Sequence, residues 1–471
     1  MKRRFLSTLM ALVLALSLVP TAAFAEEGEE ISALGETETS ESETMELTDT
    51  LDTSAVTMTQ NETAASYDTI KAAIEATSEY DSSLNKGQYT ITLNQDLTED
   101  VVIPANHYIK IDLNGHTLTN VSDHTITNNS TRTYIVDTSE DKRGVVDNIS
   151  HGKGAVYNNI NANITLQGGT YTRSAETGTS SSDNGGNSWY VLKNFGTMTI
   201  KAGVTVKFSD DNNGLYSSLI GNGWQNSGAA EAGTNNEPKP SDGGNQAKLT
   251  ISGGSFTGGQ ITVKNDDYGV LSITGGDFTQ PSEDSYAVYN ANTATISGGT
   301  FTSQATVVGS DHFDGGANTG KLTISKGTFS SENGSAVSVG AGADLTLSGG
   351  TFQTKNESAY VIGVAETATA EVSGGSFPGA TETQVVNNTS AFKEGYGVVT
   401  NQDGTVSVGV TDESAEAVVI ARDGSSTNYL TLSAAAKAAP AGSTIRLQND
   451  VVLTSGVSTV NYGVTIDLNG H

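Results

Sequence analysis

The stretch TATISGGTFTS, residues 293–303, decides the fold because variants of it recur along most of the chain. Apolar and polar residues alternate in it with the two-residue period of a β-strand, so Ile296 should face a core and Thr295 solvent. The Gly-Gly pair predicts a sharp corner, because glycine adopts positive φ without strain. Phe301 then returns to the apolar side. The stretch therefore predicts two short strands that meet at a corner.

The motif repeats at intervals typical of a solenoid. The copies are ITLQGGTY (164–171), LTISGGSF (249–256), LSITGGDF (271–278), ATISGGTF (294–301), LTISKGTF (322–329), LTLSGGTF (345–352) and AEVSGGSF (370–377). A divergent copy ends at Phe208. A period of about 20–30 residues with strand chemistry and no helical spacer favours one coil per repeat. We therefore expect an all-β fold, a right-handed parallel β-helix of about eight coils, with the aromatic rings stacked inside.

A second set of residues lies upstream of the glycines, where short strands end in asparagine. Stacked asparagine side chains can form a hydrogen-bonded ladder along such a fold. The alternative is that each asparagine only suits its own turn. Gly340 is expected to take the same place in a later coil. The asparagines are Asn158, Asn159, Asn194, Asn222, Asn265 and Asn290.

The N-terminal region predicts export and a solvated leader. Residues 1–25 have a basic start, an apolar core and a small-x-small cleavage site, which together are typical of a secretory signal peptide. Residues 26–66 contain twelve acidic and no basic residues, so we expect a disordered leader. The β-helix domain is expected over 67–412, with a short capping helix at 67–76 and a closing hairpin at 395–410. We expect no transmembrane segment after removal of the signal peptide.

The opening of this domain recurs near the end of the sequence. The hexamer IDLNGH occurs at 111–116 and again at 466–471. Upstream of the hexamers, Tyr67 of the first copy corresponds to Tyr429 of the second. Residues 413–471 are therefore expected to be the truncated start of a second, similar domain. His116 and its counterpart in the second hexamer share one turn, which favours a structural role for both.

Composition excludes several functions. The 471-residue chain carries a net charge of −29, which repels the phosphate backbone of nucleic acids. It contains no cysteine, so disulfides and thiolate metal sites are excluded. The sequence has no HExxH, P-loop, GxSxG or dinucleotide-binding motif. No catalytic, cofactor-binding or metal-binding residues can therefore be assigned.

The best cluster of carboxylates is Asp266, Asp267, Asp311 and Asp314. Asp267 and Asp311 should occupy similar places two coils apart, at roughly 10 Å, which is near the carboxyl spacing of an inverting glycosidase. No lysine or arginine is obvious nearby. We therefore favour solvated turn residues, with calcium binding or catalysis as the alternatives.

Two tryptophans are the other candidate ligand contacts. Trp189 and Trp224 flank polar insertions at 173–188 and 226–247, which should leave the stack as loops on one side. An exposed indole could stack on a sugar ring, but a tryptophan more often covers one end of a core. Both interpretations remain open at this stage.

The motifs AGSTIRLQNDV…VTIDLNGH, (L/A)TISGGTF and EGYGVVTNQDGTVSV resemble those of pectin-lyase-like parallel β-helix proteins on the surface of Gram-positive gut Firmicutes. The resemblance covers residues 67–471. It implies a secreted or cell-surface, structural or adhesin-like protein, and no catalytic activity is evident from the motifs. Its partners would be host or cell-wall glycans or proteins. The alternatives are a polysaccharide lyase or glycoside hydrolase of the same fold, or a non-catalytic glycan-binding module.

Overall fold

The computed structural model of the chain describes residues 54–175, 190–208, 218–224, 246–312 and 320–471. All of them belong to one compact unit, residues 52–471. The expected signal peptide and most of the acidic leader lie outside the described residues, as do Trp189, Asp314 and most of the two polar insertions.

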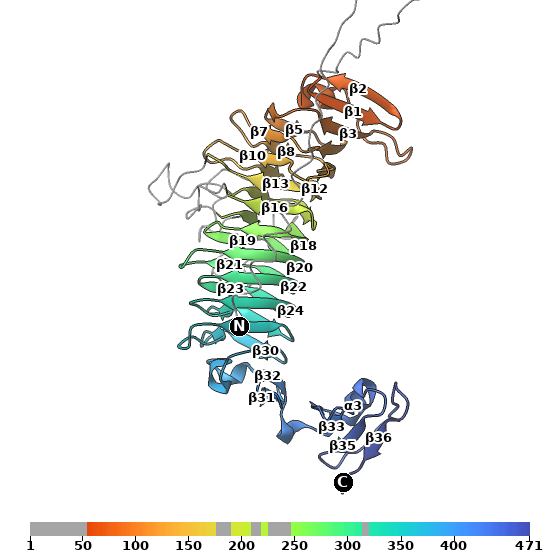
Figure 1. Cartoon of the computed structure of the whole chain (residues 1–471), viewed down its shortest axis with the longest axis vertical. Helices are drawn as coiled ribbons and strands as arrows, with labels where there is room; N and C mark the ends of the chain where they lie inside the picture. The colour runs from red at the N-terminus through yellow and green to blue at the C-terminus, as the bar shows by residue number, and fades with distance from the viewer. Residues whose placement is uncertain (1–53, 176–189, 209–217, 225–245, 313–319) are drawn as a thin grey trace, which may run out of the picture. The chain divides into compact units, whose positions relative to one another are not determined.

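The described chain forms a parallel β-helix, as the repeat predicts (Figure 1). Each coil contributes one strand to a ten-stranded sheet, here called sheet II, and runs along two adjoining faces of a 22-stranded sheet, sheet I. Strands of neighbouring coils pair in parallel and in register. The ten strands of sheet II exceed the eight expected coils, because the coils of its first two strands carry no Gly-Gly motif.

The strands follow the chain in a fixed order of three faces. Sheet II contains β5 (Val101–Ile103), β8 (Ile126–Asn128), β11 (Val156–Asn158), β14 (Leu192–Asn194), β17 (Ile220–Asn222), β19 (Ile261–Asn265), β21 (Tyr286–Asn290), β23 (Thr306–Ser310), β25 (Val337–Val339) and β28 (Ile362–Val364). The first face of sheet I contains β3 (Gln88–Leu93), β6 (Tyr108–Asp112), β9 (Arg132–Val136), β12 (Asn163–Leu166), β15 (Thr197–Ile200), β26 (Asp344–Leu347) and β29 (Thr369–Val372). The second face contains β4 (Leu97–Thr98), β7 (Thr117–Thr119), β10 (Val145–Asp147), β13 (Gly169–Thr172), β16 (Val204–Lys207), β27 (Thr351–Thr354) and β30 (Ser376–Phe377). Four long strands run through both faces, β18 (Ala247–Thr257), β20 (Gly269–Gln280), β22 (Thr293–Ser303) and β24 (Lys321–Ser331).

The corner between the two faces of sheet I depends on the second glycine of the motif. Gly299 has a φ of 103° and Gly327 a φ of 126°, which are values that favour glycine. A Cβ atom on Gly299 would lie 3.0 Å from the Phe301 ring, so the glycine also leaves room for the ring. The variant copy LTISKGTF has Lys326 in place of the first glycine and keeps the second, which is the one that the corner needs.

The interior aromatic stack is confirmed. The rings lie 4.5 to 5.6 Å apart and their planes differ by 3° to 23°. In the divergent copy, Val206 rather than Phe208 occupies the column, so ring stacking begins one coil later. The stacked and fully buried rings are Phe256, Phe278, Phe301, Phe329, Phe352 and Phe377.

The asparagine ladder is also confirmed and is longer than expected. The Nδ2 atom of each asparagine donates to the Oδ1 atom of the next at 2.7 or 2.8 Å. The same Nδ2 atoms donate to backbone carbonyl oxygens, so the buried amides are satisfied within the stack. The ladder consists of Asn128, Asn158, Asn194, Asn222, Asn265 and Asn290.

The far end of the ladder differs from the sequence prediction. Asn290 donates to the hydroxyl of Ser310 at 3.0 Å, so serine continues the column for one further coil. Val339 is next in register, not Gly340 as expected. Asn159 lies outside the ladder and bonds to the side chain of Asn129 at 2.6 Å.

The N-terminal boundary expected at residue 67 is too late. β1 (Val56–Gln60) and β2 (Thr63–Tyr67) form an antiparallel hairpin, and β1 also pairs with β3 of the first coil. The prediction of a disordered leader over 26–66 is wrong for its last residues. Eleven of the twelve acidic residues lie before residue 53, so the composition of the whole segment does not represent the residues of β1 and β2. The capping helix is present as α2 (Ile70–Glu75), with Thr69 as its N-cap.

The last coil is closed by the hairpin that the sequence predicts. Its strands are β31 (Tyr396–Thr400) and β32 (Val406–Val410), and β32 pairs antiparallel with β30. An antiparallel hairpin of this kind covers the open edge of a parallel sheet. The connecting 3₁₀ turns are η2 (Glu382–Gln384), η3 (Thr389–Ala391) and η4 (Asp412–Ser414).

The C-terminal residues repeat the topology of the first coil. A hairpin, a short helix, a strand antiparallel to the hairpin and a parallel strand follow in the same order and with the same pairings. Ile466 and Leu468 are 47% and 58% exposed, whereas their counterparts Ile111 and Leu113 are buried beneath the next coil. The elements are β33 (Ala417–Ile420), β34 (Ser426–Tyr429), α3 (Leu432–Ala438), β35 (Thr444–Leu447) and β36 (Thr465–Asp467).

Candidate functional site

The register of sheet II changes the expected pairing of the acidic residues. Asn265, Asn290 and Ser310 are in line, so Asp266 and Asp311 occupy the same column, two coils and roughly 10 Å apart. The expected match between Asp267 and Asp311 is therefore wrong by one residue. The error arose because the sequence offers no sign that a serine replaces the ladder asparagine.

Asp266 is paired with a lysine, contrary to the expectation that none lies nearby. The Lys264 Nζ atom lies 3.2 Å from Asp266 Oδ1, and the Tyr190 hydroxyl donates to Asp266 Oδ2 at 3.4 Å. Asp266 is 2% exposed, so the prediction of a solvated turn residue is wrong for it. Burial lowers the pKa of Lys264, but the charges and hydrogen bonds of Asp266 and Tyr190 together outweigh burial and leave this pKa above its ordinary value. Lys264 therefore stays protonated and is unsuited to act as a general base.

Asp267 and Trp224 lie in neighbouring turns and pair through their backbones. Their backbones exchange hydrogen bonds of 2.9 and 3.0 Å in an isolated antiparallel bridge. Asp267 is buried, so the interpretation as a solvated acid is wrong for it as well. Asp311 is half-buried, and Gly340 of the next coil leaves room for its carboxylate.

Trp224 is not available for stacking on a sugar. It is 1% exposed, and its ring lies 4.8 Å from Phe195 and 6.0 Å from Tyr268. It therefore covers part of the packed structure, which was the alternative interpretation from sequence. Trp189 is outside the described residues.

A second row of aromatic residues, which sequence analysis missed, follows the ladder on the outside of the stack. Successive ring centroids are 4.6, 5.6, 4.8 and 6.0 Å apart. Three of the rings come one to three residues after a ladder asparagine, a signal that their uneven spacing obscured. We call His124, Tyr157, Phe195, Trp224 and Tyr268 the corner aromatic row.

The ammonium group of Lys193 packs against two aromatic rings, one of which belongs to this row. Its Nζ atom lies 4.3 Å from the centre of the Tyr190 ring and 4.7 Å from that of Phe195. It also donates a hydrogen bond of 2.8 Å to the carbonyl oxygen of Gly223. Cation–π contacts and a charge-assisted hydrogen bond offset the cost of burying an ammonium group. Lys193 therefore joins two coils rather than facing a ligand.

His124, the first member of the corner aromatic row, makes the stack sensitive to acid. Burial, with a smaller effect of Lys153, lowers the pKa of His124 from 6.5 to about 4. The unfolded chain therefore binds a proton between these values and the folded chain does not, so stability falls as pH decreases from 6.5 to 4. The expected loss is about 3 kcal/mol at most.

This loss should disappear in His124→Gln, because glutamine keeps an acceptor for the Gly154 N–H, which bonds to His124 Nδ1 at 2.9 Å. Urea unfolding from pH 7 to 4 measures it as the difference between wild-type and variant. The exposed His151→Gln is the control and should follow the wild-type curve. Parallel pH curves for wild-type and His124→Gln would show that His124 does not titrate as proposed.

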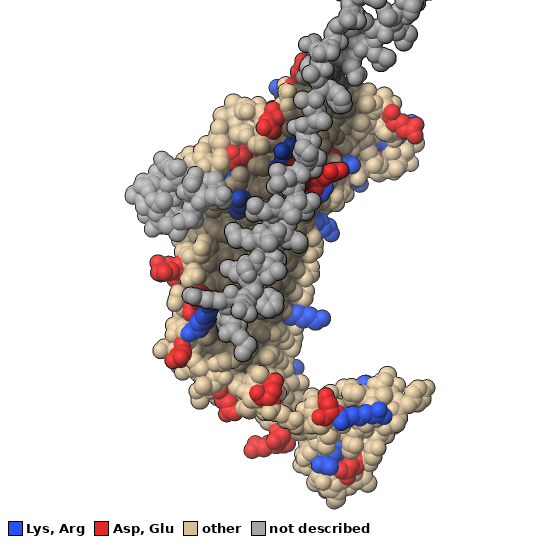
Figure 2. All heavy atoms as spheres, viewed as in Figure 1, with Lys and Arg blue, Asp and Glu red and all other residues tan. Residues whose placement is uncertain are grey.

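The described residues provide no candidate metal centre. No group of three or more His, Asp or Glu side chains gathers within them. Figure 2 shows acidic and basic side chains scattered singly over the visible face of the described chain, without a continuous patch of either sign. No helix in the described part of the chain is long and apolar enough to cross a bilayer.

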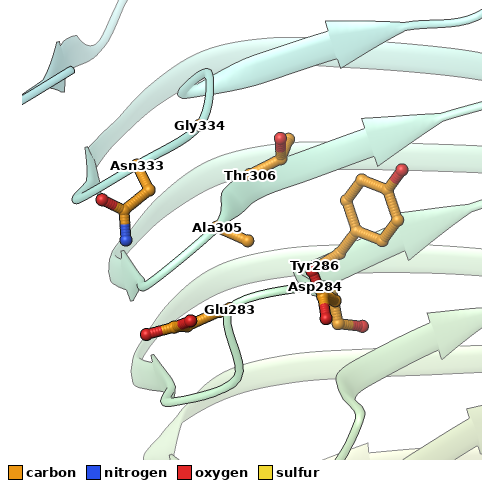
Figure 3. A pocket seen from close by; sticks show the side chains of 8 residues that line it. Glu283, Asp284, Tyr286, Ala305, Thr306, Asn333 and Gly334 are labelled. Atoms are coloured by element: carbon orange, nitrogen blue, oxygen red, sulfur yellow. The ribbon is translucent and has the colours of Figure 1, made fainter.

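One open hollow lies at the turns that precede the strands of sheet II. It has a volume of about 270 Å³ and is formed by three successive coils. Figure 3 shows Glu283 and Asn333 along one side and the Tyr286 ring on the other, with Ala305 between them. The lining residues are Glu283, Asp284, Ser285, Tyr286, Ala305, Thr306, Asn333 and Gly334. These residues share no motif in the sequence.

Comparisons with models of known protein families, with curated proteins and with solved structures find no match to this chain. Its function therefore has to be argued from the geometry of its own residues. Two features of the described residues serve that argument, namely the columns of stacked side chains and the hollow beside Tyr286.

Proposed function

We propose that the chain is an exported, cell-surface protein of structural or adhesin-like character, in which the β-helix serves as a stiff spacer. The observation that carries this proposal is the parallel, in-register pairing of neighbouring coils along the stack. Ten coils at about 4.8 Å each give a stack on the order of 50 Å long. The asparagine ladder and the ring column overlap along the stack and together join most coils to the next, which favours mechanical continuity.

The outward face of sheet I suits exposure to water rather than chemistry. Its central column consists of small hydroxyl residues in register over five coils, which hydrate well and carry no reactive group. The features of residues 1–25 and the resemblance to Gram-positive β-helix surface proteins support export and surface display. The column is Thr250, Ser272, Thr295, Thr323 and Thr346.

The contacts of the acidic residues weigh against the enzyme alternative. A lyase or hydrolase of this fold would use carboxylates and cations that face substrate. Here Asp266 is buried against Lys264, which stays protonated, and Asp267 is buried in a turn. Only Asp311 of the described acidic cluster has part of its surface open.

Three measurements test this proposal. Protease treatment of intact cells should remove the protein, and beads coated with residues 26–471 should adhere to host or cell-wall preparations. The same protein should release no reducing ends from pectin or mucin glycans. Release that is abolished by Asp311→Asn would replace the proposal with a polysaccharide-degrading enzyme. Protection of the protein inside intact cells would contradict surface display.

A further inference from the structure

We propose that the hollow beside Tyr286 binds an uncharged saccharide, as a single residue or the end of a chain. This inference deepens the proposed adhesin-like role and rests on it for its biological purpose. None of the described candidate residues suggested by the sequence, Trp224, Asp267 and Asp311, lines this hollow.

The first argument is the chemistry of the lining. Tyr286 offers the face of an aromatic ring, on which the C–H groups of a sugar can pack. Glu283, Thr306 and Asn333 offer a carboxylate, a hydroxyl and an amide, which pair with sugar hydroxyl groups in both directions. A ring face beside several polar groups is the usual composition of a small polar ligand site.

The second argument is that these polar groups are not used by the fold. Five lining side chains have no hydrogen bond or ion pair to another residue in the described ranges. They are those of Glu283, Asp284, Tyr286, Thr306 and Asn333. The adjoining turn one coil further on differs, because Lys355 pairs with Glu332 at 2.6 Å and Asn356 donates to the Asn333 carbonyl at 2.7 Å. The unpaired groups are therefore a local feature of the hollow rather than a property of every coil.

The third argument is that two glycines shape the hollow. A Cβ atom on Gly309 would lie 2.5 Å from Tyr286 Cε1, so the ring can rest over the next coil only because residue 309 is glycine. A Cβ atom on Gly334 would lie 2.8 Å from Thr306 Oγ1, so a larger residue there would displace the Thr306 hydroxyl or the backbone of Ala305 and Thr306. Tyr289, at 5.4 Å between ring centroids, supports the Tyr286 ring from the same strand.

Charge and size restrict the ligand. Glu283 and Asp284 are exposed carboxylates, and the chain carries a net charge of −29, so uronates, sulfates and phosphates are repelled. Two carboxylates offer four oxygens against the roughly six to eight that calcium takes, and no group of three or more His, Asp or Glu side chains is present among the described residues. A volume of about 270 Å³ lies at the small end of ligand pockets, which suits a single sugar residue rather than a long chain segment.

Saturation-transfer NMR on residues 26–471 tests the inference, with cellohexaose, xylohexaose, mannohexaose and maltohexaose as neutral probes and oligogalacturonate as the charged probe. At least one neutral probe should bind, and oligogalacturonate should not. Tyr286→Ala should weaken binding about tenfold. Asn333→Ala should also weaken binding. Because Asn333 is exposed, this variant should fold normally, so it tests the site even if Tyr286→Ala misfolds.

The matched control is Tyr360→Ala. Tyr360 lies in the same register column as Tyr286, three coils further on, is 46% exposed and does not line the hollow. Its removal should leave binding unchanged. Failure of all four neutral probes to bind, or equal binding by wild-type and Tyr286→Ala, would overturn the inference. The inference would also be overturned if the protein bound only Ca²⁺ or a lysine peptide, and if the double variant Glu283→Gln/Asp284→Asn lost that binding.

The failure of this inference can be told apart from failure of the proposed function. If beads adhere and the protein is on the cell surface but no sugar binds at Tyr286, the surface role stands and the saccharide site does not. If the purified protein binds a sugar through Tyr286 but is protected inside intact cells, the site stands and the surface role does not.

Discussion

Replacing Phe301 with alanine should lower the free energy of unfolding by about 3–5 kcal/mol. Phe301 is the third of six stacked rings. Its ring centroid lies 4.5 Å from that of Phe278 and 4.8 Å from that of Phe329. The change leaves a cavity and removes two ring contacts, each of which adds about 0.5–1.5 kcal/mol to simple burial. Urea unfolding of residues 26–471, followed by circular dichroism, measures the loss.

The position of the damage is as informative as its size. Each coil of a solenoid is stabilised by its neighbours, so amide hydrogen exchange should rise in β20, β22 and β24 and much less in β3 and β6. Thr300→Ala, at the exposed position next to Phe301, is the matched control and should change stability by less than about 0.5 kcal/mol. A loss below about 1 kcal/mol for Phe301→Ala would mean that the ring column contributes little to the stack.

Asn265→Asp should be the most damaging change to the ladder. Asn265 Nδ2 donates to Asn290 Oδ1, to the Gly269 carbonyl and to the Thr293 carbonyl at 2.8, 3.1 and 3.0 Å. An aspartate would face these three acceptors with an oxygen and would bury a charge. Since each unsatisfied buried group costs about 1–3 kcal/mol, we expect a total loss above about 3 kcal/mol at pH 7.

This loss should shrink in acid. A buried aspartate has a raised pKa, so the folded variant binds a proton more readily than the unfolded one, and its stability relative to wild-type recovers as pH falls. Asn265→Ser is the matched control, because the chain itself uses Ser310 in this column, and it should cost less. Asn401→Asp, at an exposed turn, should be nearly neutral. Equal stability of the aspartate and serine variants at pH 7 would contradict the ladder.

The sequence predicts those parts of the fold that repeat. The period of ATISGGTF determines which residues are interior, since Ile296 and Phe301 must return to the same place in every coil. The glycine corner and the ladder follow from the same regularity, whereas the closing hairpin is predicted from its own turn at residues 401–404. The β1–β2 hairpin does not repeat along the stack, and the acidic residues before it concealed its alternating pattern.

The candidate sites were less predictable because they depend on contacts between coils. A single replacement, serine for asparagine at residue 310, shifted the inferred partner of Asp311 from Asp266 to Asp267. Lys264 and Asp266 are close in sequence, but their partner Tyr190, which donates to Asp266, is 76 residues away from it. The hollow at Tyr286 collects residues from three turns that share no motif, so no pattern in the sequence marks it.

Distances between spin labels on the Thr250 column test the stacked register most directly. The chain contains no cysteine, so pairs of engineered cysteines can be labelled without a background. Thr250→Cys combined in turn with Thr295→Cys, Thr323→Cys or Thr346→Cys places the labels two, three or four coils apart. Backbone separations should rise linearly by about 4.8 Å per coil, to about 19 Å for the longest pair. Distances that do not increase with coil number, or that are broadly distributed, would contradict the parallel β-helix.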